Sequence, residues 1–280
     1  MRLFLLTSLV MVAFAANSVL NRLAMAGGEI GPASFATVRL AAGALVLAGL
    51  VLARSGRVPL MAPGRLLGAG SLVLYMLGFS FAYLSLNAGL GALILFGGVQ
   101  ITMFAGAVLA GETIPPRRWA GAAVAFGGLA WLLWPAGAGA PDPLGAGLMA
   151  AAALGWGIYS LAGRHAADPL AATAANFTVA LPVALLALAV AQDGGGTTAR
   201  GIALAVASGA VTSGLGYALW YRVLPGLASA QAAVAQLTVP VIALAGGAVV
   251  LGEAPGARML MAGGVVLAGV GLAALKGRTR

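Results

Sequence analysis

The sequence predicts an all-α polytopic membrane protein with ten transmembrane helices in two inverted five-helix repeats, and three observations lead to this prediction. Of the 280 residues, 61% are hydrophobic and only 8% are charged, whereas a soluble domain carries about 25% charged residues. The apolar residues fall into windows of about 20, the length that crosses a hydrocarbon core of about 30 Å. Finally, the second half of the chain repeats the pattern of the first.

The expected helices are joined by short connections, and several begin at a proline. Pro32, Pro116, Pro169 and Pro255 stand at or near first-turn positions, where the missing N–H of proline removes no helical hydrogen bond. The 43 glycines suit helices that pack closely through small side chains in lipid. In chain order, we expect helices over residues 3–25, 32–53, 65–86, 89–110, 116–134, 144–164, 170–191, 200–223, 227–251 and 256–276.

The first of these helices could also be a signal peptide. Arg2 precedes an apolar core, and Ala13-Phe14-Ala15 resembles a cleavage site. The apolar run continues past that site to Met25, however, which is the length of a spanning segment. We therefore expect the segment to be retained as the first transmembrane helix.

The basic residues predict the orientation in the membrane. An even number of spans places both termini on one side, and Arg22, Arg200 and Arg258 would then face the other side. Positive charge gathers in the cytoplasmic loops of membrane proteins. We therefore expect an inner-membrane protein with both termini in the cytoplasm, and we interpret the net charge of +9 as an orientation signal rather than a nucleic-acid site. The basic residues expected on the side of the termini are Arg2, Arg54, Arg57, Arg65, Arg117, Arg118, Arg164, Arg222, Lys276, Arg278 and Arg280.

Equivalent residues recur about 140 positions apart. The corresponding pairs are Phe14 and Trp156, Arg22 and Arg164, Tyr75 and Ser213, Phe79 and Tyr217, Tyr83 and Tyr221, Gly111 and Gly252, and Glu112 and Glu253. Each copy holds five helices, and an odd number inverts the second copy, as in many secondary transporters. We expect the first repeat over residues 1–137 and the second, inverted repeat over residues 138–280.

Several short motifs, most of them present in both halves, mark the layout of the chain. An aromatic-plus-small pair stands in the first helix of each half (Phe14-Ala15 and Trp156-Gly157), Arg39 stands in the second helix, and Gly-Glu ends each fourth helix. Over the whole chain this layout resembles the EamA branch of the drug/metabolite transporter superfamily. The proline that this family has before Gly-Glu is matched by Pro240, whereas the first half has Gln100 near that place.

The resemblance implies an exporter of amino acids, other metabolites or drugs, and the YddG-type amino-acid exporters are the most similar in length and layout. It implies alternating access around a pocket between helices 1, 3, 4, 6, 8 and 9. We expect amino acids, including aromatic or other apolar ones, as the cargo. Two alternatives stay open, which are an exporter of hydrophobic or cationic drugs and a structural membrane protein that transports nothing.

Several chemistries have no basis in the sequence. There is no cysteine, the single His165 cannot form a metal cluster, and no GxxxxGK[ST] motif is present. We expect no catalytic residue, metal or cofactor. The expected partners are a small-molecule substrate and the lipid bilayer, and the sequence leaves the oligomeric state open. All six acidic residues fall in loops or at helix ends, so we expect facilitated export rather than a buried proton relay.

Arg39 is the charge that lies clearly inside a predicted span. Its side chain could extend to the external interface or bond to the carbonyls of a neighbouring helix. It could also bind a substrate carboxylate, for which a planar guanidinium is well suited. A single arginine argues against a polyphosphate cargo.

Aromatic residues at four-residue spacing are the next candidates for the substrate site. Each set shares one helix face, and the alternative role is an interfacial tyrosine belt. The first set is Tyr75, Phe79 and Tyr83, and the second is Ser213, Tyr217 and Tyr221. Trp156 and Tyr159 lie one turn apart on the sixth helix. We expect a concave, mostly apolar pocket lined by these side chains.

Polar residues and prolines inside the spans complete the candidates. Asn17 could contact substrate or bond to a neighbouring helix, and Gln100 and Gln236 form a further polar group with Pro240. Pro240 frees the carbonyl of Gln236, and Pro182 is a second candidate hinge. Glu112 and Glu253 are expected to cap helix starts at opposite membrane surfaces, because a carboxylate stabilises unpaired N–H groups there. Cargo coupling through these two glutamates is the alternative.

Overall fold

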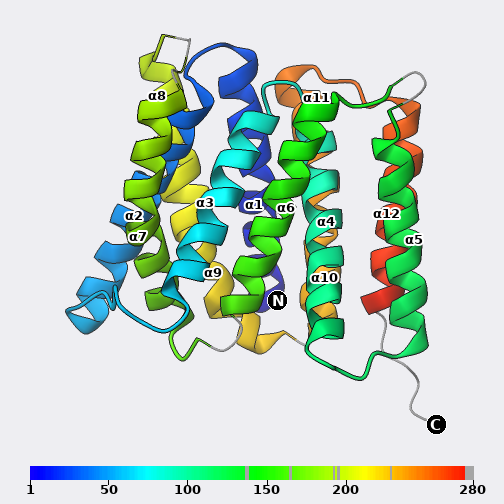
Figure 1. Cartoon of the computed structure of the whole chain (residues 1–280), viewed down its shortest axis with the longest axis horizontal. Coiled ribbons are helices and arrows are strands. Elements are labelled where there is room, and N and C mark those ends of the chain that lie inside the picture. The colour runs from blue at the N-terminus through cyan, green and yellow to red at the C-terminus, as the bar shows by residue number, and fades with distance from the viewer. Residues whose placement is uncertain (136–138, 164–165, 192, 194–195, 228, 275–280) are drawn as a thin grey trace.

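The computed structural model describes residues 1–135, 139–163, 166–191, 193, 196–227 and 229–274 (Figure 1). All regular structure within these residues is helical, which confirms the predicted fold class. Arg164, His165, Lys276, Arg278, Arg280 and the predicted boundary at residue 137 lie outside them. The helices are α1 (Arg2–Ala26), α2 (Pro32–Ser55), α3 (Arg65–Ala82), α4 (Ala88–Leu109), α5 (Pro116–Leu133), α6 (Pro143–Gly163), α7 (Pro169–Ala191), α8 (Ala199–Val206), η1 (Ala207–Leu215), α9 (Gly216–Val223), η2 (Leu224–Gly226), α10 (Ser229–Gln236), α11 (Thr238–Leu251) and α12 (Ala257–Ala274).

These helices form ten membrane spans. Nine stretches of the described chain have the length and hydropathy of a spanning helix, and the seventh of these, which is the eighth span along the chain, runs from Ala199 to Gly226 through α8, η1, α9 and η2. The remaining span, α5, is 18 residues long and packs along α12. Its lower hydropathy follows from Arg117 and Arg118, which stand in its first turn.

The two repeats run in opposite directions. The start of α1 and the end of α12 lie toward the same end of the molecule (Figure 1), which we call the basal end, and the opposite end is the apical end. The first helix of the first repeat, α1, runs from the basal to the apical end (Figure 1). The first helix of the second repeat, α6, runs from the apical to the basal end (Figure 1). An odd number of spans per copy requires this inversion.

Helices of one repeat pack against helices of the other in matched pairs. The α3 helix packs on α6, and its counterpart, the η1–α9 part of the eighth span, packs on α1. The remaining pairs join equivalent helices directly, namely α2 with α7, α4 with α11 and α5 with α12. The two repeats therefore share one interface through the middle of the bundle, and the buried aromatic side chains lie along it.

Two spans depart from regular α-helix. The ninth span is interrupted at Leu237, between α10 and α11. Pro240 follows three residues later, and its missing N–H leaves the carbonyl of Gln236 without its helical donor. The eighth span contains the nine-residue π-helix η1. Pro182, by contrast, lies within the continuous helix α7.

Carboxylates cap several helix starts, where unpaired peptide N–H groups and the helix dipole favour negative charge. Asp193 accepts hydrogen bonds from the N–H groups of Ala33 (3.3 Å) and Ser34 (2.6 Å) at the start of α2. Asp142 accepts one from the N–H of Gly145 (2.7 Å), at the start of α6. The acidic residues that the sequence places in loops thus stabilise the ends of the spans.

Candidate functional site

Arg39 on α2 lies at the centre of the bundle, and its side chain is fully buried. Its Nη2 atom donates to the phenol oxygen of Tyr75 over 2.9 Å, and its Nε atom donates to the hydroxyl of Ser213 over 3.1 Å. The guanidinium carbon lies 5.3 Å from the ring centre of Tyr75 and 5.0 Å from that of Phe79. The side chain therefore points into the protein and does not extend to the helix end.

The charge of Arg39 has no counter-ion within the described residues. The ion pairs of this part of the chain involve other arginines, and the Nη1 atom of Arg39 is buried without a hydrogen-bond partner. A buried charge is costly unless it is paired and fully hydrogen-bonded. Two aromatic faces and two hydroxyls stabilise this cation in part, and one donor remains available for an anion.

Aromatic rings surround the guanidinium and continue across the interface between the repeats. Trp156 on α6 is central, because its ring contacts Tyr75 at 4.9 Å, Tyr217 at 5.1 Å and Tyr159 at 5.3 Å between centroids. Tyr217 on α9 also packs edge-on against Phe14 of α1 at 5.7 Å. The sequence-predicted aromatic residues from opposite repeats thus form one cluster.

A small cavity lies within this aromatic cluster. Its volume is about 10 Å³, which is room for about one water molecule. The site is therefore closed in this structure. The cavity is lined by Phe14, Asn17, Tyr75, Phe79, Leu95, Phe96, Trp156 and Tyr217.

Five of the sequence-predicted site residues line this cavity, namely Asn17, Tyr75, Phe79, Trp156 and Tyr217. Arg39 adjoins it through its hydrogen bond to Tyr75, and Ser213 in turn bonds to Arg39. Tyr159 stacks on Trp156, and its hydroxyl donates to Thr173 over 3.1 Å. Tyr83 is fully buried and packs edge-on against Phe79 at 4.8 Å.

Gln100 and Gln236 are among the predicted residues that do not line the cavity, and three lining residues, Phe14, Leu95 and Phe96, were not predicted. Gln100 and Gln236 are half-buried and line no part of the cavity, and no described residue of the ninth span lines it. Leu95 and Phe96 on α4 line it instead. They stand in an almost wholly apolar helix, where no feature of the sequence distinguishes a pocket residue from a packing residue.

Asn17 connects the cavity to the π-helix. Its side-chain oxygen accepts hydrogen bonds from Thr212 and, over 2.8 Å, from Ser208, which both belong to η1. The bond to a neighbouring helix, one of the two roles expected from the sequence, is present, and Asn17 also lines the cavity. The same helix supplies Ser213 to Arg39, and η1 therefore holds two polar side chains of the site.

Comparisons with known proteins agree with this architecture. Residues 143–275 match the EamA-like transporter family. The uncharacterized protein PA1977 of Pseudomonas aeruginosa PAO1 is 46% identical over 272 residues, which cover 97% of this chain and 94% of that protein. The chain belongs to the EamA-like transporter family. A solved structure described only as a crystal structure of a protein shares the fold, with a TM-score of 0.67 over 94% of both chains at 21% identity.

The EamA-like transporter also has a larger apolar hollow near its basal end. It encloses about 810 Å³ between the first half of α1 and the segment from η2 to α12. Met11 lines this basal groove, and Phe14, one turn further along α1, lines the central cavity. The groove therefore reaches to within one helical turn of the aromatic cluster.

The two Gly-Glu pairs of the transporter lie at opposite ends of the bundle, after α4 and after α11 (Figure 1). The carboxylate of Glu253 accepts a hydrogen bond from the N–H of Ala88 over 2.8 Å. It therefore caps the start of α4 in the other repeat, rather than the start of α12, which follows it in the chain. Glu112 stands after Gly111, whose φ of 70° is left-handed, and its own N–H donates to the carbonyl of Ala107.

Proposed function

We propose that this protein exports small metabolites across the cytoplasmic membrane by alternating access, with amino acids that carry aromatic or other apolar side chains as the cargo. Membership of the EamA-like transporter family supports a membrane transporter of small molecules. The observation that carries the choice of cargo is the buried, incompletely bonded guanidinium of Arg39 beside an aromatic cavity.

A carboxylate is the ligand that this guanidinium lacks. The Nη1 atom of Arg39 is a free donor in a buried environment, where a charge-assisted hydrogen bond is about twice as strong as a neutral one. A cargo carboxylate would supply both the missing bond and the missing negative charge. Cationic drugs without an acid group gain nothing from Arg39 and are repelled by it, so they are the weaker candidates.

The aromatic cluster suits the remainder of an amino acid. The rings of Phe79, Trp156 and Tyr217 line the cavity and offer apolar surface for a side chain. Aromatic faces also attract an ammonium group, so the same rings can accept the positive end of a zwitterion. Asn17 adds a polar group to an otherwise apolar lining, the combination that is usual in small-molecule sites.

The closed cavity implies movement, because about 10 Å³ cannot hold an amino acid. We assign residues 1–137 and 138–280 as two repeats whose helices rock around Arg39, with the basal end in the cytoplasm. The concentration of basic residues at that end supports this orientation. The basal groove supports cargo entry there, because it extends toward the cavity along α1.

The coupling that we propose is facilitated export down the gradient of the cargo. In the described part of the chain no carboxylate contacts Arg39 or lines the cavity. The carboxylates that cap helices or form ion pairs near the ends of the bundle are those of Glu29, Asp142, Asp168, Asp193 and Glu253. Accumulation of cargo above equilibrium in proteoliposomes, dependent on an imposed pH gradient, would contradict this coupling.

Counterflow in proteoliposomes tests the function directly. Vesicles are loaded with unlabelled phenylalanine, leucine or tryptophan, and uptake of the labelled amino acid is followed, with a lipophilic cation measured in parallel. We expect counterflow of the amino acids above protein-free vesicles. Movement of the lipophilic cation alone would favour a drug exporter, and movement of no compound in a broad panel would favour a structural protein.

A further inference from the structure

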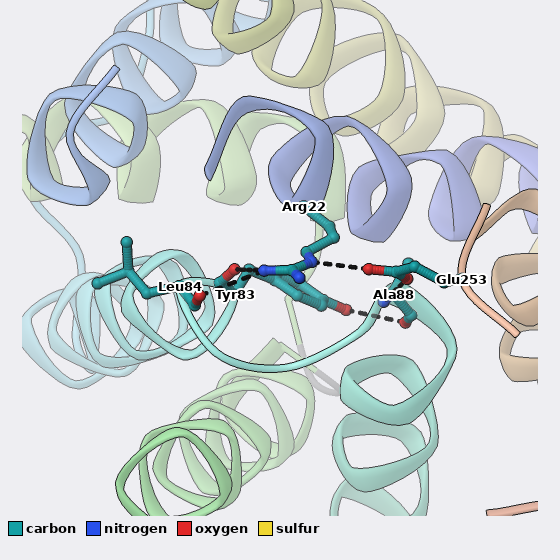
Figure 2. A network of polar contacts seen from close by, with 5 residues as sticks. All are labelled: Arg22, Tyr83, Leu84, Ala88 and Glu253. Atoms are coloured by element: carbon teal, nitrogen blue, oxygen red, sulfur yellow. Dashed lines mark hydrogen bonds and ion pairs between the residues drawn. The ribbon is translucent and has the colours of Figure 1, made fainter. Parts of the chain in front are cut away.

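A network of polar contacts closes the apical end of the bundle (Figure 2). Arg22, in the last turns of α1, donates from Nε to the carboxylate of Glu253 over 2.7 Å. Its Nη1 atom donates to the carbonyl oxygens of Tyr83 (2.9 Å) and Leu84 (3.2 Å). The other oxygen of Glu253 accepts from the N–H of Ala88. We call these five residues the apical clasp.

The clasp joins four segments that are far apart in the chain. They are the end of α1, the turn after α3, the start of α4 and the loop between α11 and α12 (Figure 2). Arg22 and Glu253 are 231 positions apart and belong to opposite repeats. Any movement that separates α1 from the loop between α11 and α12 at the apical end must therefore break this ion pair.

The clasp lies in line with the central site. Tyr83, whose carbonyl binds Arg22, places its ring on Phe79 at 4.8 Å, and Phe79 contacts Tyr75 at 5.4 Å. Arg39 lies over the rings of Phe79 and Tyr75. A continuous column of side chains on α3 thus connects the clasp to the buried guanidinium.

An unused polar atom lies between the clasp and the site. Asn21 is fully buried one position before Arg22, and its amide nitrogen donates to the hydroxyl of Ser80 on α3 over 3.0 Å. Its side-chain oxygen has no hydrogen-bond partner. A buried acceptor that is left unbonded is unfavourable, and separation of α1 from α3 would expose this atom to water or cargo.

We propose that the apical clasp is the outer gate of the transport path. Breaking the Arg22–Glu253 pair opens the apical end above the aromatic cluster, and the oxygen of Asn21 then becomes the first polar contact on the way out. The inference rests on the proposed transport function and specifies how access to that same site is controlled.

The exposure of the ion pair suits a reversible gate. The side chains of Arg22 and Glu253 are 18% and 13% exposed, so each is shielded from solvent when the gate is closed and can rehydrate when it opens. In a shielded pair the attraction is offset by the loss of hydration. The closed and open states can therefore lie close in free energy, as cycling between them requires.

The absence of native cysteine allows a direct measurement of access. Leu95 lines the central cavity and is 3% exposed, and Leu95→Cys therefore reports whether the site is open. A membrane-impermeant thiol reagent is added to one side of proteoliposomes of known orientation, and the labelling rate is measured. In an otherwise unchanged chain we expect slow labelling from the apical side.

Arg22→Gln is the primary variant, because it removes the ion pair while Glu253 can still cap the N–H of Ala88. We expect it to raise the apical labelling rate of Leu95→Cys about fivefold, the factor that corresponds to the loss of one modest ion pair. Labelling from the basal side should fall, because the open-outward state excludes the open-inward state. Arg22→Lys keeps the charge and should retain slow apical labelling.

A second ion pair at the same end provides the control. Arg200 and Glu29 pair over 3.0 Å, and Arg200 is 62% exposed, away from the clasp. Arg200→Gln should leave both labelling rates unchanged. Unchanged apical labelling in Arg22→Gln would overturn the gate, whether or not any cargo is transported. Faster labelling from both sides would also overturn it, because that result indicates general loosening.

The labelling result is independent of the cargo. Faster apical and slower basal labelling in Arg22→Gln would support the gate even if the tested amino acids were not transported. Amino-acid counterflow together with unchanged labelling would support the proposed function and reject the gate. Failure of the proposed transport function and failure of the proposed gate can thus be distinguished in one set of vesicles.

Discussion

Arg39 donates a hydrogen bond of 2.9 Å to the phenol oxygen of Tyr75. The second side-chain partner of Arg39, Ser213, is the residue that corresponds to Tyr75 in the other repeat. Equivalent positions of the two repeats thus hold one guanidinium between them. Arg39 therefore lies where the repeats meet, and a change in the way they pack would alter its hydrogen bonds first.

Replacing Arg39 by glutamine should abolish the preference for carboxylate-bearing cargo. Removing a charged hydrogen bond costs about 1.5–3 kcal/mol, so we expect amino-acid counterflow to fall at least about tenfold. Movement of a lipophilic cation should be unchanged or faster, because the positive charge is gone. Arg200→Gln, at the exposed apical surface, serves as the control. Equal loss for amino acids and cations would indicate a structural role for Arg39.

Removing rings from the aromatic cluster should lower the affinity for cargo more than it lowers the stability of the protein. Trp156→Ala and Tyr217→Ala each remove a ring from the cavity wall, and large aromatic side chains dominate such contacts. We expect the KM for an aromatic amino acid to rise about tenfold. Trp119→Ala is a matched control, because Trp119 pairs with Phe104 away from the cavity and is 51% exposed. Normal transport by both cavity variants would remove these residues from the site.

Gly209 in η1 should tolerate no side chain. A Cβ atom placed there would overlap the backbone carbonyl of Arg39 on α2, and forcing extra atoms into a packed interface costs about 1–3 kcal/mol. Gly209→Ala should therefore lower the Tm of the detergent-solubilised protein. Gly49→Ala, in α2 with open space around it, should leave the Tm unchanged or raise it. An unchanged Tm in Gly209→Ala would show that α2 and η1 are not held so closely.

The repeat predicts a second gate at the basal end. Glu112 corresponds to Glu253, and Arg164 corresponds to Arg22, although Arg164 lies outside the described residues and this prediction depends on the sequence repeat. Glu112→Gln should raise basal labelling of Leu95→Cys and lower apical labelling, the reverse of Arg22→Gln. The same shift in Arg164→Gln would strengthen the equivalence. A shift toward the apical side in either variant would contradict it.

Most of the fold could be predicted from the sequence, because bilayer thickness fixes the length of a span and the copied motifs fix the inversion. The ends of the spans agree to within a few residues except after α3, which ends at Ala82 although a helix to residue 86 was expected. The π-helix was not predicted. Its extra residue per turn depends on contacts with α1 and α2, such as those of Asn17 and Arg39, and no local pattern reveals them.

The candidate site was predictable where chemistry stood out from an apolar background. Arg39, Asn17 and the aromatic residues are rare side chains inside spans, and the structure brings them together. Leu95 and Phe96 resemble every other apolar residue of α4, so only the packing reveals their place. The partner of Glu253 was equally hidden, because contact with Arg22 over 231 positions depends on how the repeats assemble.

Glu253 accepts hydrogen bonds from both Arg22 and the N–H of Ala88. When the ion pair breaks, Glu253 therefore keeps one of its partners, whereas Arg22 loses its carboxylate. When Arg22 moves away, the carboxylate stays on the N–H of Ala88, where the peptide dipoles of α4 continue to solvate it. Only the guanidinium of Arg22 needs new hydrogen-bond partners, and the adjacent bulk water supplies them. The anion is thus a stationary element, and α1 is the element that travels past it. Reorganisation during opening is confined to one long, flexible side chain, which favours fast and repeatable exchange between the two faces of the membrane.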